Sequence, residues 1–448
     1  MRTAALRTSA PRAHAGEPRP APRFALAPPA GIELTGIGLL ALAAGFFAEF
    51  SADVIGQLFL TEVLLIPVAL VALMAARGTQ AFGRPMFWAL LGGAVIMLCG
   101  YMLTDTIRGT AENQYLRGWG RIAMLISDMV CVMVLVASDR RNLWWLSLGM
   151  GVGGLFYLVF VEATPLSHWK IGYATPVTLL VLCAGYLLSK PLLIAGLLGV
   201  SAVGIVFDAR AEPVITLVVA ALLWANTSRP GFSAWGSTLR RVALPLSLGA
   251  VAVAVGFALT QDEFGHRRDH SSLGRYLSFT LGLKAIAESP LIGYGSWSDN
   301  KEISREQEDI MLRELGNAAA APIRGRGFSP HSQILQSWYE GGLLGAVFFL
   351  ALGHALYRHL GFVLLRRAVD GLSGLLVYMS LTGAWHLFMS PFLGEHRLRI
   401  ALTAGTLLIL AGEFDRQRRA PRGAGQAGTP GRPVLRRPSP FPFIGEKS

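Results

Sequence analysis

The segment Phe328-Ser-Pro-His-Ser-Gln-Ile-Leu-Gln-Ser-Trp-Tyr-Glu-Gly-Gly-Leu-Leu-Gly345 marks the point where a long polar stretch gives way to an apolar run. His331 precedes this run, and Glu340 with a pair of glycines lies inside it. A histidine at a boundary between membrane and water is well placed for proton transfer, because its ordinary pKa lies near neutrality. The segment therefore predicts a membrane span with a candidate base at its mouth.

Similar apolar runs recur along almost the whole chain. Of its 448 residues, 52% are hydrophobic and 15% are charged, whereas soluble domains have about a quarter of their residues charged. We predict an all-α polytopic membrane protein with about twelve transmembrane helices and one large, partly helical outer loop. The predicted spans cover residues 33–50, 55–76, 86–106, 120–138, 143–162, 174–189, 191–208, 211–227, 242–260, 334–357, 372–390 and 399–413.

The basic loops predict the orientation and the domain boundaries. Lys and Arg gather in alternate loops and in both tails, which places both termini in the cytoplasm. The predicted domains are a disordered tail over 1–30, transmembrane helices over 31–260, an outer loop over 261–333, transmembrane helices over 334–413 and a disordered tail over 414–448. Within the outer loop, the spacing of apolar residues predicts an amphipathic helix over 272–288 and a solvated helix over 299–315.

The formal charge of +12 follows the same loops and tails, so we attribute it to orientation in the membrane and expect no nucleic-acid partner. The sequence contains no CxxC pair. His266 and His270 have the spacing of a metal pair, but no third ligand lies nearby. We therefore predict no metal site.

Several arginines fall on the predicted outer side, against the orientation bias, and each needs a negative partner. Guanidinium groups stay protonated and bind phosphate oxygens in pairs, which makes these arginines candidates for a phosphate site. Other interpretations remain open. Arg275 could be an interfacial anchor, Arg210 could be a turn residue paired with Asp208, and Arg324 and Arg326 could belong to a flexible basic linker. The candidates are Arg117, Arg121, Arg210, Arg275, Arg324 and Arg326.

The order of several short motifs resembles that of the O-antigen ligase and Wzy polymerase superfamily. They are Asp208-Ala-Arg-Ala211, Gly274-Arg275, Pro290-Leu-Ile-Gly-Tyr-Gly295, His331-Ser332 and Glu340-Gly-Gly-Leu-Leu-Gly345. The resemblance covers residues 205–350 and implies a multi-pass glycosyltransferase of the bacterial inner membrane with a large periplasmic loop. It also implies a polyprenyl-diphosphate-linked glycan donor, a glycan, lipid or protein acceptor, and catalysis without a metal or other cofactor.

Combined with the chemistry of the residues, the resemblance assigns roles. His331 would take the proton of the acceptor hydroxyl as it attacks the anomeric carbon, and this direct displacement would invert that carbon. Arg275 and Arg210 would stabilise the departing lipid diphosphate, which makes these three the predicted catalytic residues. The predicted substrate-binding residues are Arg324, Arg326, Arg117, Arg121, Glu340 and Tyr294; of these, Glu340 is better placed to orient other groups than to act as a base.

Three functions remain open at this point. A ligase and a polymerase share the donor chemistry, so the sequence does not separate them. A secondary transporter would also have about twelve spans, and its proton pathway would use the intramembrane carboxyls Glu62 and Asp128. The third is a scaffold of an envelope polysaccharide assembly complex.

Trp297 and Trp338 are expected at the membrane interface, where either could also stack on a sugar.

Overall fold

The computed structural model describes residues 35–227, 265–315 and 328–419, apart from positions 55, 76–77, 171, 188–189, 208, 210, 298–299 and 366–371. Several predictions lie outside the described residues. They are the tail 1–30, the span 242–260, the catalytic candidate Arg210, the loop arginines Arg324 and Arg326, and the tail from residue 420 onward.

Apolar helices dominate the described chain, as the hydropathy pattern predicts. Four are long and apolar enough to cross a membrane: α3 (Pro85–Arg108), α4 (Glu112–Ser138), α5 (Arg141–Phe156) with its π-helical continuation (Tyr157–Val161), and α13 (Gln333–Leu365) over residues 333–362. The remaining helices of the bundle are α1 (Gly36–Phe46), α2 (Leu60–Met74), α6 (Ala174–Leu187), α7 (Lys190–Val206), α8 (Ala211–Thr227), α14 (Ser373–Met389) and α15 (Arg397–Arg419). This composition is that of an all-α membrane protein.

The first connection of the bundle differs from the prediction. The strands β1 (Ser51–Asp53) and β2 (Gln57–Phe59) form an antiparallel pair with Ser51 opposite Phe59, and α2 begins only at Leu60. Gly56, with φ of +94°, forms the turn between them, a conformation that glycine adopts readily. The predicted span 55–76 therefore starts too early, because polar and glycine residues at 51–57 favour a turn over a helix. At the other end of the chain, α15 continues past the predicted boundary at 413 to Arg419.

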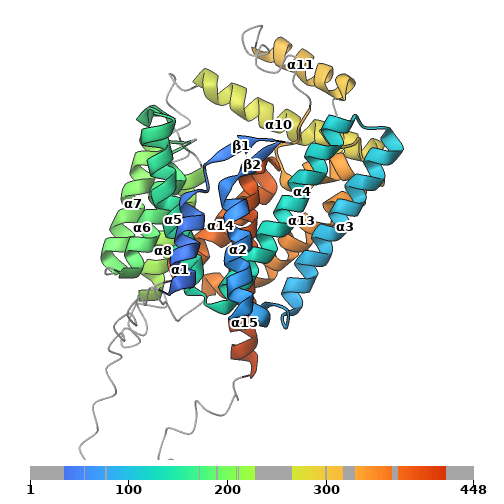
Figure 1. Cartoon of the computed structure of the whole chain (residues 1–448). Helices are drawn as coiled ribbons and strands as arrows, with labels where there is room; N and C mark the ends of the chain where they lie inside the picture. Colours follow the sequence, from blue (N-terminus) through green and yellow to red (C-terminus); the bar gives the residue numbers. More distant parts are fainter. Residues whose placement is uncertain are drawn as a thin grey trace, which may run out of the picture.

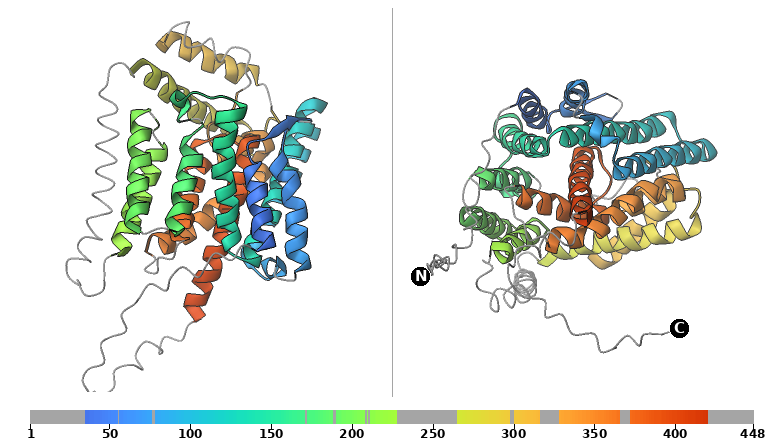
Figure 2. Two further views of the ribbon diagram at one scale, coloured as in Figure 1. Left: turned by 60° about the vertical axis from the view of Figure 1, so that its left-hand side comes forward. Right: turned by 90° about the horizontal axis from the view of Figure 1, so that it is seen from below.

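Two helices lie across one end of the bundle, outside the apolar helices: α10 (Gly265–Glu288) and α11 (Lys301–Leu315) (Figures 1 and 2). They confirm the two helices predicted for this segment. Leu277 and Leu281 of α10 share a buried cluster with Ile303 and Met311 of α11. The β1–β2 pair lies at the same end, whereas α3 begins, and α4 and α15 end, at the opposite end (Figure 1).

Helix α13 is broken in its first third. Gly342 has φ of +65° and ψ of −163°, so the helical hydrogen bonds stop there. A segment before α11 replaces them: the amides of Tyr294 and Gly295 donate to the carbonyl oxygens of Tyr339 (2.8 Å) and Glu340 (3.0 Å). The amide of Leu343 donates to the carbonyl oxygen of Leu291 (3.3 Å). The two glycine-containing motifs therefore pack on each other, and backbone groups freed by the break are bonded inside the protein, as an apolar environment requires.

We expect Gly342→Ala to destabilise the protein strongly. An alanine at this position would have to adopt the positive φ of Gly342, which costs about 1–3 kcal/mol on its own. Its Cβ would also overlap the carbonyl oxygen of Leu291. Thermal unfolding in detergent measures the effect. Gly361→Ala in the same helix is the matched control, because nothing lies within 4 Å of the added Cβ. Equal melting temperatures for the two variants would show that the break does not need glycine.

Candidate functional site

The predicted base and one predicted arginine lie together at the α10 end of the bundle. His331 lies just before α13 begins, and its side chain reaches the surface. Partial burial against the surrounding protein, and then the positive charge of Arg275 on α10, lower the pKa of His331 below its ordinary 6.5, while a hydrogen bond with the Ser329 backbone opposes them. The imidazole is therefore neutral near pH 7 and able to accept a proton.

A buried ion pair joins α4 to α13. Arg121 and Glu340 are each 3% exposed and form a direct salt bridge. The hydroxyl of Tyr101 and the side-chain amide of Gln336 each donate to the Glu340 carboxylate (2.9 Å). Arg121 also donates to the carbonyl oxygen of Phe392 (2.6 Å). Glu340 therefore orients Arg121 and neutralises its charge, in line with the orienting role, and direct contact of Glu340 with a substrate stays a prediction.

A cavity of about 1000 Å³ lies beside this pair, between the β1–β2 region, α3, α4 and the start of α15. Its apolar wall includes Leu98 and Met102 of α3 and Met124 of α4. Its polar wall contains the predicted residues Arg117 and Arg121, one helical turn apart on α4, together with Asp53, Gln57, Glu395 and Arg397. The cavity is therefore apolar on one side and charged on the other.

Two tryptophans face this cavity, and one carboxylate positions both. The indole nitrogen of Trp119 donates to Asp105 (2.8 Å). The amide and the hydroxyl of Ser296 also donate to Asp105, at 2.6 and 2.7 Å, and fix the turn that carries Trp297. Trp297 has φ of +54°, which is uncommon for a bulky residue. Its ring centroid lies 4.8 Å from the Arg121 guanidinium carbon, within the range of a cation–π contact.

Arg397 is a cavity residue that the sequence prediction missed. It is 4% exposed, and its Nε lies 2.6 Å from Oε1 of Glu62. Its Nη2 donates to Oε2 of Glu62 (3.0 Å) and to the carbonyl oxygen of Gln57 (2.5 Å). The run Glu395-His-Arg-Leu-Arg399, polar amid apolar sequence, was the available signal. Glu62, considered above for a proton pathway, is thus the ion-pair partner of Arg397.

Tyr294 lies apart from the cavity residues. Its ring stacks on Tyr339 with centroids 5.0 Å apart, and the Arg108 guanidinium carbon lies 5.3 Å above it. Arg108 in turn donates to the carbonyl oxygen of Gly293 (2.8 Å) and to the hydroxyl of Ser289 (2.8 Å). Tyr294 therefore fixes the loop against the broken helix, and a substrate contact for it stays a prediction.

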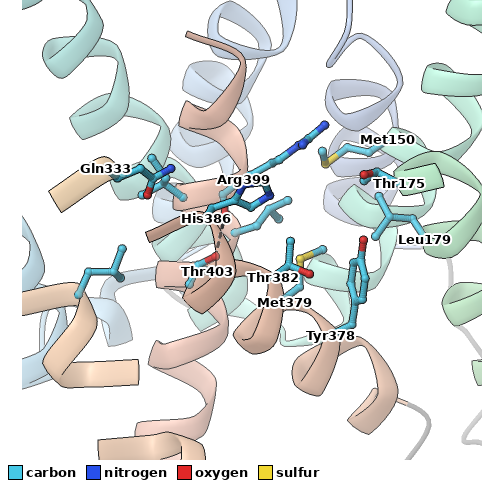
Figure 3. A pocket seen from close by; sticks show the side chains of 14 residues that line it. Met150, Thr175, Leu179, Gln333, Tyr378, Met379, Thr382, His386, Arg399 and Thr403 are labelled. Atoms are coloured by element: carbon cyan, nitrogen blue, oxygen red, sulfur yellow. Dashed lines mark hydrogen bonds between the residues drawn. The ribbon is translucent and has the colours of Figure 1, made fainter. Parts of the chain in front are cut away.

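A second, smaller cavity lies among α5, α6, α13, α14 and α15 (Figure 3). His386, Arg399 and Gln333 contribute polar groups to it, and Tyr378 and Thr382 line it as well. Its volume is about 20 Å³, which is room for a water molecule but not for a sugar.

Comparisons with known proteins add no assignment: no family model matches the chain, and no curated protein is similar to it. Within the described part of the chain, no group of three or more His, Cys, Asp or Glu residues could hold a metal ion. The candidate site therefore consists of His331 with Arg275, and of the cavity that Arg117, Arg121 and Arg397 line.

We expect Glu340→Gln to cost about 3–5 kcal/mol of stability, because it leaves the Arg121 charge buried without a counter-charge. The melting temperature of the purified protein measures this loss. Glu306→Gln is the control, since it breaks the exposed pair with Lys284, and exposed pairs contribute little. A Glu340→Gln protein as stable as the control would show that Arg121 finds another partner.

Proposed function

We propose that this protein transfers a saccharide from a polyprenyl-diphosphate donor to a hydroxyl group of a glycan, lipid or protein acceptor. The reaction takes place at the periplasmic face of the bacterial inner membrane. About twelve spans and two cytoplasmic termini belong to the same proposal. The observation that carries it is the position of His331, which lies near Arg275 of α10 in a segment that packs against this helix, so that burial and the Arg275 charge lower its pKa.

The proposed reaction is a single displacement. His331 takes the proton from the acceptor hydroxyl while its oxygen bonds to the anomeric carbon. The bond from that carbon to the diphosphate oxygen breaks, so the carbon is inverted and the lipid diphosphate leaves. Arg275 stabilises the negative charge of the leaving group. Arg210, Arg324 and Arg326 are proposed to assist it. Because guanidinium groups supply the positive charge, the proposal includes no metal.

One observation favours the transporter as a second candidate. Asp128, in the middle of α4, is fully buried and lies against the carboxyl group of Glu62, without a hydrogen bond from a neutral or cationic donor among the described residues. Buried intramembrane carboxyls of this kind occur in proton pathways. A proton-coupled transporter would lose its function with Asp128→Asn and keep it with His331→Ala, whereas a glycosyltransferase would show the reverse.

The first measurement is the lipid-linked glycans that accumulate in the host when the gene is deleted. Long polymer retained on the polyprenyl diphosphate would indicate a lost ligase, and single repeat units a lost polymerase. We expect His331→Ala to reproduce the deletion, and Arg275→Lys to impair transfer severely, because an ammonium cannot replace a bidentate guanidinium.

The matched controls are His354→Ala and Arg358→Lys, which change exposed residues of α13. Both should leave the glycan pattern normal. Unchanged lipid-linked glycans in the deletion strain, in a host without a second such enzyme, would contradict the proposed function. A normal pattern in the His331→Ala strain would remove the assignment of the base.

The lowered pKa of His331 predicts the pH dependence. A base must be neutral to accept a proton, so transfer stays constant near neutrality and is lost as the pH falls through a value below 6.5. Arg275→Gln removes a positive charge, so the pKa of His331 rises. NMR of labelled histidine rings, assigned with His331→Ala, measures this shift independently of activity. A pKa at or above 6.5 in the unmodified protein would contradict the prediction.

A further inference from the structure

We propose that the cavity beside Trp119 and Trp297 binds the glycan portion of a substrate, specifically a neutral or amino-bearing pyranose chain. The inference rests on the proposed function only for the identity of the lipid carrier to which that glycan is attached. It assigns Trp297 and Trp119 as saccharide-binding residues of a cavity that Arg275 does not line.

The aromatic surface is the first argument. Sugar rings pack their C–H faces on indole rings, and Trp combines a large apolar face with a polar edge. The indole nitrogen of Trp119 is bonded to Asp105 and its ring contacts Tyr115, with centroids 4.6 Å apart, so the part of the ring that lines the cavity is its apolar carbon surface. Trp297 is 39% exposed in spite of its position at the cavity. Residues in strained backbone conformations cluster at binding sites. They persist only where the surrounding structure holds them in place. Asp105 provides that support through Ser296.

The charge balance is the second argument, and it disfavours the diphosphate role predicted for Arg117 and Arg121. Arg121 is already paired with Glu340, and Arg397 with Glu62. Among the described residues, Arg117 is the lining cation without an ion pair, and the exposed carboxylates Asp53 and Glu395 lie at the same cavity.

A diphosphate carries several negative charges and would meet two carboxylates there. Neutral sugars avoid this repulsion. Their hydroxyl groups donate to carboxylates such as Asp53 and Glu395 and accept from a guanidinium such as Arg117, and charge-assisted hydrogen bonds of this kind are the stronger ones. An amino group on the sugar would add attraction to the same carboxylates.

Size and position are the third argument. The cavity volume of about 1000 Å³ is at the upper end for small-ligand sites, which span about 300–1,000 Å³, and it accommodates a short oligosaccharide. The first part of α13 connects the cavity to the proposed base: His331 precedes that helix, and Glu340 at its break contacts Arg121 of the cavity wall. A glycan bound there lies at the same end of the bundle as His331.

Isothermal titration calorimetry on the full-length protein in nanodiscs tests the inference. The probes are maltotetraose as a neutral chain, chitosan tetramer as an amino-bearing chain and tetragalacturonate as an acidic chain. We expect the neutral or the amino-bearing chain to bind at least tenfold more tightly than the acidic one. Trp297→Ala should weaken that binding about five- to tenfold, the range for loss of one aromatic contact. Trp297→Phe should weaken it less.

Trp88→Ala is the control, because Trp88 is an exposed tryptophan near the opposite end of α3; its binding should match that of the unmodified protein. A melting temperature for each variant, together with Trp297→Phe, separates loss of binding from loss of fold. Tighter binding of the acidic chain, an unchanged affinity in Trp297→Ala, or no binding of any probe would overturn the inference.

The two proposals fail separately. Normal lipid-linked glycans in the deletion strain would contradict the proposed function and leave the calorimetry to decide the role of the cavity. Accumulated lipid-linked glycans without affinity for the probes would overturn the cavity inference alone.

Discussion

The salt bridge between Arg121 and Glu340 is the interaction on which the rest of the site depends. Charges inside an apolar bundle are costly unless they are paired and hydrogen-bonded, and this pair satisfies both conditions. The hydroxyl of Tyr101 links Glu340 to α3, and the carbonyl oxygen of Phe392 links Arg121 to the connection between α14 and α15. The cavity wall and the broken helix thus share one fixed point, and the guanidinium that Trp297 covers cannot move without unpairing a buried carboxylate.

The break in α13 places a polar loop against a membrane helix without leaving its backbone groups unpaired. Residues 291–295 take over the hydrogen bonds that Gly342 interrupts, and Arg108 ties the same loop to the end of α3. The loop follows α10 directly, and Leu277 of α10 packs in one cluster with Phe328 and Tyr339. Backbone contacts and apolar packing therefore hold together the segments that carry Arg275 and His331.

Local patterns predicted the helices well, because apolar runs and their spacing depend on neighbouring residues. Helix α8 has the predicted bounds 211–227, and α10 and α11 cover the two helices predicted over 272–288 and 299–315, although α10 begins seven residues earlier. The β1–β2 pair was missed because strands of three residues carry little periodic signal. Partners that are distant in the sequence could not be predicted from local patterns either. Arg121 and Glu340 are 219 residues apart, and Arg397 and Glu62 are 335 residues apart. His331 and Arg275 could be named as candidates, whereas the tryptophan-lined cavity required the fold.

The order of residues along the chain gives the broken helix one further property. The stretch 291–295, which completes the hydrogen bonding of α13, lies on its N-terminal side and is synthesised before it. When the ribosome releases the break at Gly342, its hydrogen-bonding partner has already been made, together with the α3 and α4 surfaces on which that partner rests. The broken helix can therefore dock on segments that precede it in the chain, and its freed carbonyl groups find their partners there.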